Sequence, residues 1–120
     1  MTKILVVEDQ EDNRQILRDL LASVDYEMVE AENGEQALTA VTEHKPDLIL
    51  MDIQMPVMDG YEATRRIKAD PTLNGIPIIA VTSYALSGDE QKARAAGCDD
   101  YIAKPYSPRQ MLAKVRGILG

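Results

Sequence analysis

Hydrophobic residues along the chain gather in five short runs, and amphipathic stretches separate each run from the next. The runs occupy residues 4–7, 26–31, 48–51, 76–81 and 101–103. Turn-forming or acidic residues border each run, and this pattern is typical of strands. Because helical stretches alternate with strands and no repeat or long linker interrupts them, the pattern predicts one α/β domain over residues 1–120.

Two of the intervening stretches predict helices that pack an aliphatic face on the sheet. After the first run, the inward positions are Ile16, Leu17, Leu20, Leu21 and Val24. The C-terminal stretch repeats this spacing with Met111, Leu112, Val115, Ile118 and Leu119. Both helices are therefore expected to contribute to the core.

Three further helices are expected between the remaining runs. Asn33-Gly34 and Asp59-Gly60 each open a stretch with apolar residues on one face. Residues 87–96 begin like a capped helix, but their inward positions are mostly alanines. Because alanine buries little apolar surface, we expect this helix to be the least firmly docked.

The polarity of the runs predicts the order of the strands. A central parallel strand is buried on both faces and is almost wholly apolar, which fits the first, third and fourth runs. Residues 26–31 alternate with acids and the run 101–103 is short, so both suit the edges. Right-handed crossovers then favour a doubly wound parallel sheet of order 2-1-3-4-5 with helices on both faces.

Polar residues stand where four of these runs end. Glu8 and Asp9 follow the first run, Asp52 the third, Thr82 the fourth and Lys104 the fifth. The carboxyl ends of parallel strands share one edge of the sheet, and open α/β folds bind their ligands there. We therefore expect Asp9 and Asp52 to face each other across the crevice between the first and third strands.

The residue types at this edge predict phosphoryl chemistry. Three carboxylates so close repel one another unless their pKa values rise or a cation binds, and oxygen ligands favour Mg²⁺ or Ca²⁺. We choose Mg²⁺, since it accepts phosphate oxygens and leaves Asp52 able to attack phosphorus. Lys104 supplies a positive charge and Thr82 a hydroxyl donor for the phosphoryl oxygens. An acidic turn that favours the dipole of the first helix would also explain Glu8-Asp9.

Charge and composition narrow the classes of partner. The formal net charge of −7 disfavours binding to nucleic acid or to anionic lipid, so the expected partners are proteins. No signal peptide or apolar stretch of membrane length is present in the sequence, which favours a cytoplasmic location. Cys98 is the only cysteine, which excludes an internal disulfide and indicates a packing residue. His44 lies between two charged residues and is expected at the surface.

Five ordered segments of the chain are similar to a known family. They cover residues 4–9, 47–56, 58–60, 77–82 and 104–105. With these segments the chain resembles the receiver domains of two-component response regulators, of the single-domain, chemotaxis and hybrid-kinase types, over nearly its whole length. The resemblance implies a flavodoxin-like (βα)5 fold. It also implies a signalling domain that catalyses only its own Mg²⁺-dependent phosphorylation and dephosphorylation, and not an enzyme acting on outside substrates.

The resemblance implies a role for each site residue. Asp52 would be the phosphoacceptor, and Asp9, Asp52 and the backbone carbonyl of Gln54 would bind Mg²⁺. Glu8 would act on the metal through water. Thr82 and Lys104 would contact the phosphoryl oxygens. The bond before Pro105 would be cis.

The resemblance also implies partners and a switch. The phosphoryl group would come from a histidine kinase or a histidine phosphotransfer protein. Its charge would draw Thr82 inward and vacate space for the ring of Tyr101, so that the helix at 87–96 can shift. A downstream protein would bind the surface that this helix forms with the fifth strand and the last helix.

Other functions fit the residues less well. Phosphohydrolases of the haloacid-dehalogenase type share the aspartate, hydroxyl, lysine and magnesium. Their nucleophile stands in an Asp-x-Asp motif, however, whereas this chain has Asp52-Ile53-Gln54. A dinucleotide or flavin module needs a glycine-rich loop after the first strand, where residues 8–12 are mostly acidic. A degenerate receiver would lack an acidic or lysine position, and all are present. A further alternative is that the chain is a receiver cut from a longer regulator or hybrid kinase. The start at Met1 and the end at Gly120 disfavour this alternative.

Two further residues, in addition to those that take part in the chemistry, could tune the lifetime of the phosphoryl group. Gln54 and Tyr84 stand two positions after Asp52 and Thr82, where they would border the path of attacking water. We expect Tyr84 to shield the phosphoryl group, although a surface tyrosine at a helix start is an equal alternative.

Overall fold

The structure is a computed structural model that describes residues 2–55, 57–82 and 89–119. Within these residues the strands are β1 (Lys3–Val7), β2 (Glu27–Ala31), β3 (Leu48–Asp52), β4 (Ile78–Thr82) and β5 (Asp100–Ala103). The helices are α1 (Glu11–Ala22), α2 (Gly34–His44), α3 (Gly60–Ala69), α4 (Asp89–Ala96) and α5 (Pro108–Leu119). Strands and helices alternate along the chain, as the hydrophobic pattern predicted.

The strands form one parallel sheet in the order β2-β1-β3-β4-β5, which confirms the predicted topology. Every residue of β3 and β4 is buried, and β1 is buried from Ile4 onward. The edge strand β2 instead exposes Glu27 and Glu30. Burial on both faces therefore explains why the three central strands are nearly all apolar.

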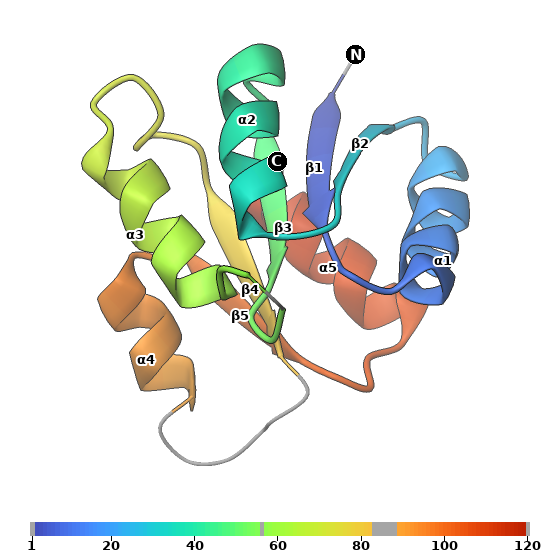
Figure 1. Ribbon diagram of the computed structural model, residues 1–120. Coiled ribbons are helices and arrows are strands. Elements are labelled where there is room, and N and C mark those ends of the chain that lie inside the picture. Colours follow the sequence, from blue (N-terminus) through green and yellow to red (C-terminus); the bar gives the residue numbers. More distant parts are fainter. Residues whose placement is uncertain (1, 56, 83–88, 120) are drawn as a thin grey trace.

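Helices cover both faces of the sheet, α1 and α5 on one side and α2, α3 and α4 on the other (Figure 1). Two layers of buried side chains result. The layer under α1 and α5 includes Leu17, Leu21, Leu48, Leu50, Ile79, Met111 and Val115. The layer under α2, α3 and α4 includes Val7, Val41, Ile49, Met51, Ile67, Ala93 and Cys98. Cys98 is thus the buried packing residue that the sequence indicated, and His44 is exposed.

The prediction for the first helix was wrong at two positions. Ile16 was expected in the core, but 58% of it is exposed, and Val24 lies beyond the last residue of α1. Leu17 and Leu21 are buried against the sheet and fill the face that the sheet covers. Ile16 lies beside this face and lines a groove with Pro105 and Tyr106.

The residues that were expected to open α2 and α3 cap these helices with their side chains. The side chains of Asn33 and Asp59 each accept a hydrogen bond from the backbone N–H of the residue three positions later, at 2.8 and 2.9 Å. In α4 the buried apolar residues of the described range are Ala93 and Ala96, as expected. Ser87, the predicted start of this helix, lies outside the described residues. None of the described helices combines the length and apolarity that crossing a membrane requires.

Candidate functional site

The parallel sheet brings the predicted polar residues to one edge. Asp52 and Thr82 are the last residues of β3 and β4, and Lys104 directly follows β5. In the strand register Asp52 pairs with Val81, so Thr82 lies one residue further along the neighbouring strand. The hydroxyl, the carboxylate and the ammonium group therefore come from successive strands of the sheet.

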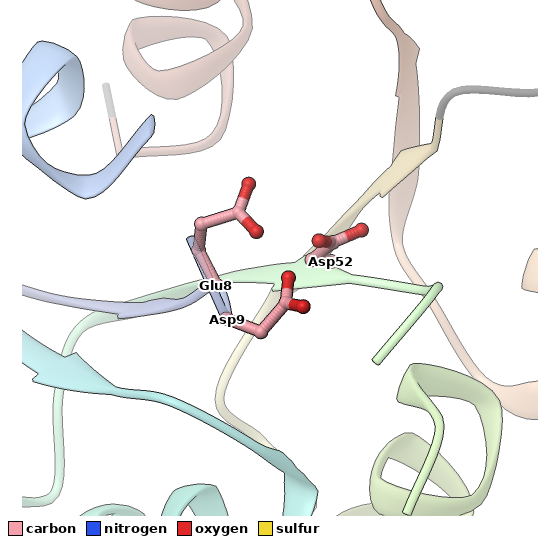
Figure 2. A group of neighbouring side chains, drawn as sticks. All are labelled: Glu8, Asp9 and Asp52. Carbon is pink, nitrogen blue, oxygen red and sulfur yellow. The ribbon is translucent and has the colours of Figure 1, made fainter. Parts of the chain in front are cut away.

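Three carboxylates form the centre of the site. Glu8, Asp9 and Asp52 each offer an oxygen within 4.8 Å of the other two, at the ends of β1 and β3 (Figure 2). Glu8 is 3% and Asp52 4% exposed, so solvent does little to screen the repulsion between their charges. Buried carboxylates at this spacing repel one another unless a proton or a cation binds between them. The juxtaposition of Asp9 and Asp52 agrees with the prediction.

Lys104 neutralises part of the acidic charge. Its Nζ lies 2.9 Å from Oε1 of Glu8 and 3.6 Å from Oδ2 of Asp52. Burial lowers the pKa of Lys104, but the hydrogen bond to Glu8 and the charge of Asp52 outweigh burial and hold this pKa above its ordinary value. Among the described residues, its single ammonium group thus contacts two carboxylates of a cluster of three, which leaves an excess of negative charge.

The carboxylates differ in their affinity for protons. Burial, followed by the hydrogen bond and charge of Glu8, raises the pKa of Asp52 to about 7. Burial also acts to raise the pKa of Glu8, but hydrogen bonds with Asp52, Lys104 and Asp9 lower it to about 2. Burial and Glu8 together raise the pKa of Asp9. Near neutral pH, Glu8 is therefore ionised while Asp52 retains a proton for part of the time.

The donor set fits a hard divalent cation. All the candidate ligands are oxygens, and Mg²⁺ and Ca²⁺ prefer oxygen ligands whereas zinc favours nitrogen or sulfur. The excess of negative charge in a buried cluster is what a divalent ion would compensate. The backbone N–H of Gln54 donates to Oδ1 of Asp52 at 3.2 Å, which orients the carboxylate and fixes the peptide that follows it.

The chain around the cluster is closely packed. A Cβ atom on Gly60, the first residue of α3, would collide with the backbone oxygen of Asp52 and lie 2.8 Å from Cα of Ile53. The N–H of Gly60 also donates to the carbonyl of Ile53 at 3.0 Å. A glycine is therefore required where α3 begins against the end of β3.

The other predicted residues that the structure describes lie in β4, in β5 and directly after β5. Thr82 is buried, and Tyr101 of β5 is half-buried against the core layer under α4. The Lys104–Pro105 peptide bond is cis, as the resemblance implied. Tyr84 lies outside the described residues.

Sequence reasoning missed two side chains. Arg14 of α1 is buried, and its Nη1 donates to the backbone carbonyl of Glu8 at 2.7 Å. Tyr106, after the cis bond, lines a small space together with Glu8, Asp52 and Lys104, and burial raises its pKa. Glu11, three residues before Arg14, signals an ion pair along the helix, but no local pattern relates Arg14 to the end of β1.

Comparisons with known proteins agree with this geometry. A family model described as the response regulator receiver domain matches residues 4–116. The polar-differentiation response regulator DivK of Brucella ovis is 45% identical over 121 aligned positions, which cover 100% of this chain and 98% of the relative.

Solved structures show the same fold. A putative response regulator from Chloroflexus aurantiacus has a TM-score of 0.94 at 30% identity, covering 98% of this chain and 97% of the other. The receiver domain of the sensor histidine kinase PA1611 from Pseudomonas aeruginosa has a TM-score of 0.92 at 37% identity, covering 99% and 98%. The latter structure has a magnesium ion coordinated in its active-site cleft. With these matches over nearly its whole length, the chain belongs to the response regulator receiver domain family.

Proposed function

We propose that residues 1–120 form one phosphoacceptor switch of a two-component phosphorelay and that Asp52 receives the phosphoryl group. The observation that carries this proposal is the cluster of Glu8, Asp9 and Asp52 with Lys104 at the end of the sheet. It combines an anionic oxygen nucleophile with a cationic group and a set of oxygen ligands. This combination suits the transfer of a phosphoryl group to a carboxylate.

Mg²⁺ is the proposed cofactor. Asp9, Asp52 and the backbone carbonyl of Gln54 would hold the ion, and Glu8 would act through water. When bound, the ion supplies positive charge that offsets the negative charge of the incoming phosphoryl group.

The protein residues carry the transfer itself. An oxygen of Asp52 attacks phosphorus, the new P–O bond gives an aspartyl phosphate, and the P–N bond to the donor histidine breaks. The electron pair of that bond returns to the imidazole. Lys104 and the Thr82 hydroxyl bind the phosphoryl oxygens, and Lys104 has to move from Glu8 toward the new group. Gln54 and Tyr84 are proposed to tune the lifetime of the phosphoryl group through the access of water.

The partners follow from the reaction and from the surface. The proposed donor is a histidine kinase or a histidine phosphotransfer protein, and the proposed target is a downstream protein that binds the α4-β5-α5 face. A groove of about 670 Å³ lies on this face, lined by residues of β5 and α5 that include Tyr101, Ile102, Ala113 and Ile118. Direct binding of nucleic acid is not expected, given the net charge of −7.

The switch is proposed to run from Asp52 to this groove. The phosphoryl group adds negative charge and acceptor oxygens, which draw Thr82 toward Asp52. Tyr101 then turns into the space that Thr82 leaves, and α4 shifts. The burial of Thr82 and the half-burial of Tyr101 support a coupled movement, because each side chain needs space from a neighbour in order to move.

The intact mass of the protein tests the proposal. After incubation with Mg²⁺ and acetyl phosphate, the wild type should gain one phosphoryl group, and Asp52→Asn should gain none. Chelation of Mg²⁺ should also abolish the gain. Continuous release of phosphate from several monoesters, with many turnovers per molecule, would instead support a phosphohydrolase.

A further inference from the structure

Arg14 is a buried charge that the proposed phosphoryl transfer does not use. Only 7% of it is exposed, although arginine is among the residues that are least often buried. Its guanidinium group contacts Glu11 at 2.6 Å, Glu30 at 3.3 Å and Glu32 at 3.4 Å. The three carboxylates compensate the charge, but they do not explain why one nitrogen is directed elsewhere.

That nitrogen, Nη1, donates a hydrogen bond of 2.7 Å to the backbone carbonyl of Glu8. A hydrogen bond from a charged donor is stronger than one between neutral groups. The N–H of Glu8 donates to the carbonyl of Ala31 at 3.0 Å, and its carboxylate accepts from Lys104. The backbone N–H of Gln10 also donates to Oε2 of Glu8 at 3.4 Å. Among these four contacts, the one with Arg14 is made to the carbonyl of the peptide that joins Glu8 to Asp9.

The orientation of this peptide decides where Asp9 lies. A rotation about the Cα–C bond of Glu8 would turn this carbonyl away from Arg14 and carry the Cα atom of Asp9 with it, so that the carboxylate of Asp9 would shift relative to Asp52. We propose that Arg14 is a positioning residue for the metal site, because its guanidinium group fixes this peptide and thereby holds Asp9 in place for Mg²⁺. The inference rests on the proposed function, in which Asp9 and Asp52 bind the ion.

The sign of a mutational effect separates positioning from simple electrostatics. Removal of a positive charge close to a cation site should strengthen the binding of Mg²⁺. Loss of a group that orients a metal ligand should weaken binding, typically about 10-fold to 100-fold. The two roles of Arg14 therefore predict opposite changes in affinity.

Arg18 is a matched control. It lies one turn further along α1 and pairs with Glu11 and Glu30, two of the acids that Arg14 contacts. Its described hydrogen bonds go to Gln15, Glu11 and Glu30 and not to Glu8. Arg18→Met removes the same charge from the same network but leaves the Glu8–Asp9 peptide held.

Isothermal titration of the intact chain with MgCl₂ tests the inference. Arg14→Met should bind Mg²⁺ about 10-fold more weakly than the wild type, and Arg18→Met should stay within about twofold. In phosphorylation by acetyl phosphate, the half-saturating Mg²⁺ concentration of Arg14→Met should rise by the same factor. The rate at saturating Mg²⁺ should change little, whereas a general loss of structure would lower it.

Arg14→Lys serves if Arg14→Met fails to fold, as judged by urea unfolding in EDTA. Lysine keeps the charge but cannot bridge the carbonyl of Glu8 and several carboxylates with one planar group, so binding should weaken at least about threefold. Equal or tighter binding of Mg²⁺ in a folded Arg14 variant would overturn the inference and leave the proposed function intact. Absence of Mg²⁺ binding in the wild type would overturn the proposed metal site itself.

Discussion

At the scale of single residues, Asp52 is buried, whereas its proposed role as a nucleophile requires it to ionise. Its surroundings raise its pKa to about 7, mainly through burial and secondly through Glu8. The native state then binds more protons at Asp52 than the unfolded chain does between about pH 4 and pH 7. A carboxyl group with a raised pKa stabilises the fold at low pH, and this contribution is lost as the pH rises through 7.

Metal-free protein should therefore lose stability between about pH 4 and pH 7. The lowered pKa of Glu8 contributes nothing to this change, since its stabilising effect is lost only as the pH falls toward 2. Asp52→Asn removes the buried charge and should be more stable than the wild type at pH 8 by about 2 kcal/mol, after allowance for solvent screening. The difference should fall to about a third of this value at pH 5.

Urea unfolding in EDTA, followed by circular dichroism at both pH values, measures this effect. The titratable groups outside the cluster are common to the two proteins, so the difference between them reports Asp52 together with Glu8 and Lys104, whose pKa values depend on it. A difference that stays constant with pH would contradict the raised pKa.

Lys104 should have opposite effects on metal binding and on phosphoryl transfer. Lys104→Met leaves Glu8 and Asp52 without their ammonium partner, so Mg²⁺ should bind about threefold more tightly or better. The proposed contact with the phosphoryl oxygens is lost at the same time, and phosphorylation by acetyl phosphate should slow by about 100-fold.

Calorimetry and intact mass against time measure these two effects. Lys114→Met is the control, because it removes an equal charge from α5, where Lys114 pairs with Asp100 of β5. Weaker Mg²⁺ binding in Lys104→Met would show that Lys104 supports the ligands and does not compete with the ion.

At the scale of the elements, the start of α3 is fixed by its contact with the end of β3. Gly60→Ala should destabilise the fold by about 3 kcal/mol, because the new methyl group meets backbone atoms that cannot give way. Gly117, within α5, has open space around it, since no described atom beyond its chain neighbours and its own helix backbone lies within 4 Å of the position that a Cβ would take. Gly117→Ala should therefore stabilise the protein by about 0.5 to 1 kcal/mol through helix propensity.

Thermal or urea unfolding of the two alanine variants tests the contrast between these glycines. Equal effects would show that the backbone at Gly60 relaxes without cost. Phosphorylation of Gly60→Ala should also decrease, since the collision involves the backbone of Asp52 itself.

Helix α4 should open more readily than α5. The buried apolar side chains described in α4 are two alanines, whereas α5 buries Met111 and Val115. Hydrogen exchange of the amides in Asp89–Ala96 should accordingly be faster than in the middle of α5. Phosphorylation, or beryllofluoride as its mimic, should change exchange in α4 and β5 more than in α1. Uniform protection across the helices would contradict this prediction.

At the scale of the whole molecule, the fold could be predicted because its signals are local and agree with one another. Apolar runs define the strands, and the acids of β2 identify an edge. Their boundaries were less exact: β4 was expected to begin at Ile76 but begins at Ile78. Pro77 explains this, since proline has no N–H for the ladder, although its carbonyl accepts from Ile49.

The features that could not be predicted, the contacts of Arg14 and the exposure of Ile16, depend on how distant segments of the chain pack together. Asp9 and Asp52 could be placed together because parallel strands end at one edge. The contact of Arg14 with Glu30 and Glu32 depends on how α1 lies over β2, and no spacing in the sequence encodes that arrangement. The exposure of Ile16 likewise depends on how much of α1 the sheet covers.

The two alanines of α4 also bear on how the proposed signal is graded. Burial of two methyl groups contributes only about 1 to 2 kcal/mol, which corresponds to roughly a tenfold ratio between two positions of the helix. In the proposed switch, a population ratio of that size would give unmodified molecules a standing fraction in the displaced arrangement. The unphosphorylated protein would then bind its downstream partner at a low basal level. The volume of the side chain at position 93, where Ala93 stands, would set that level.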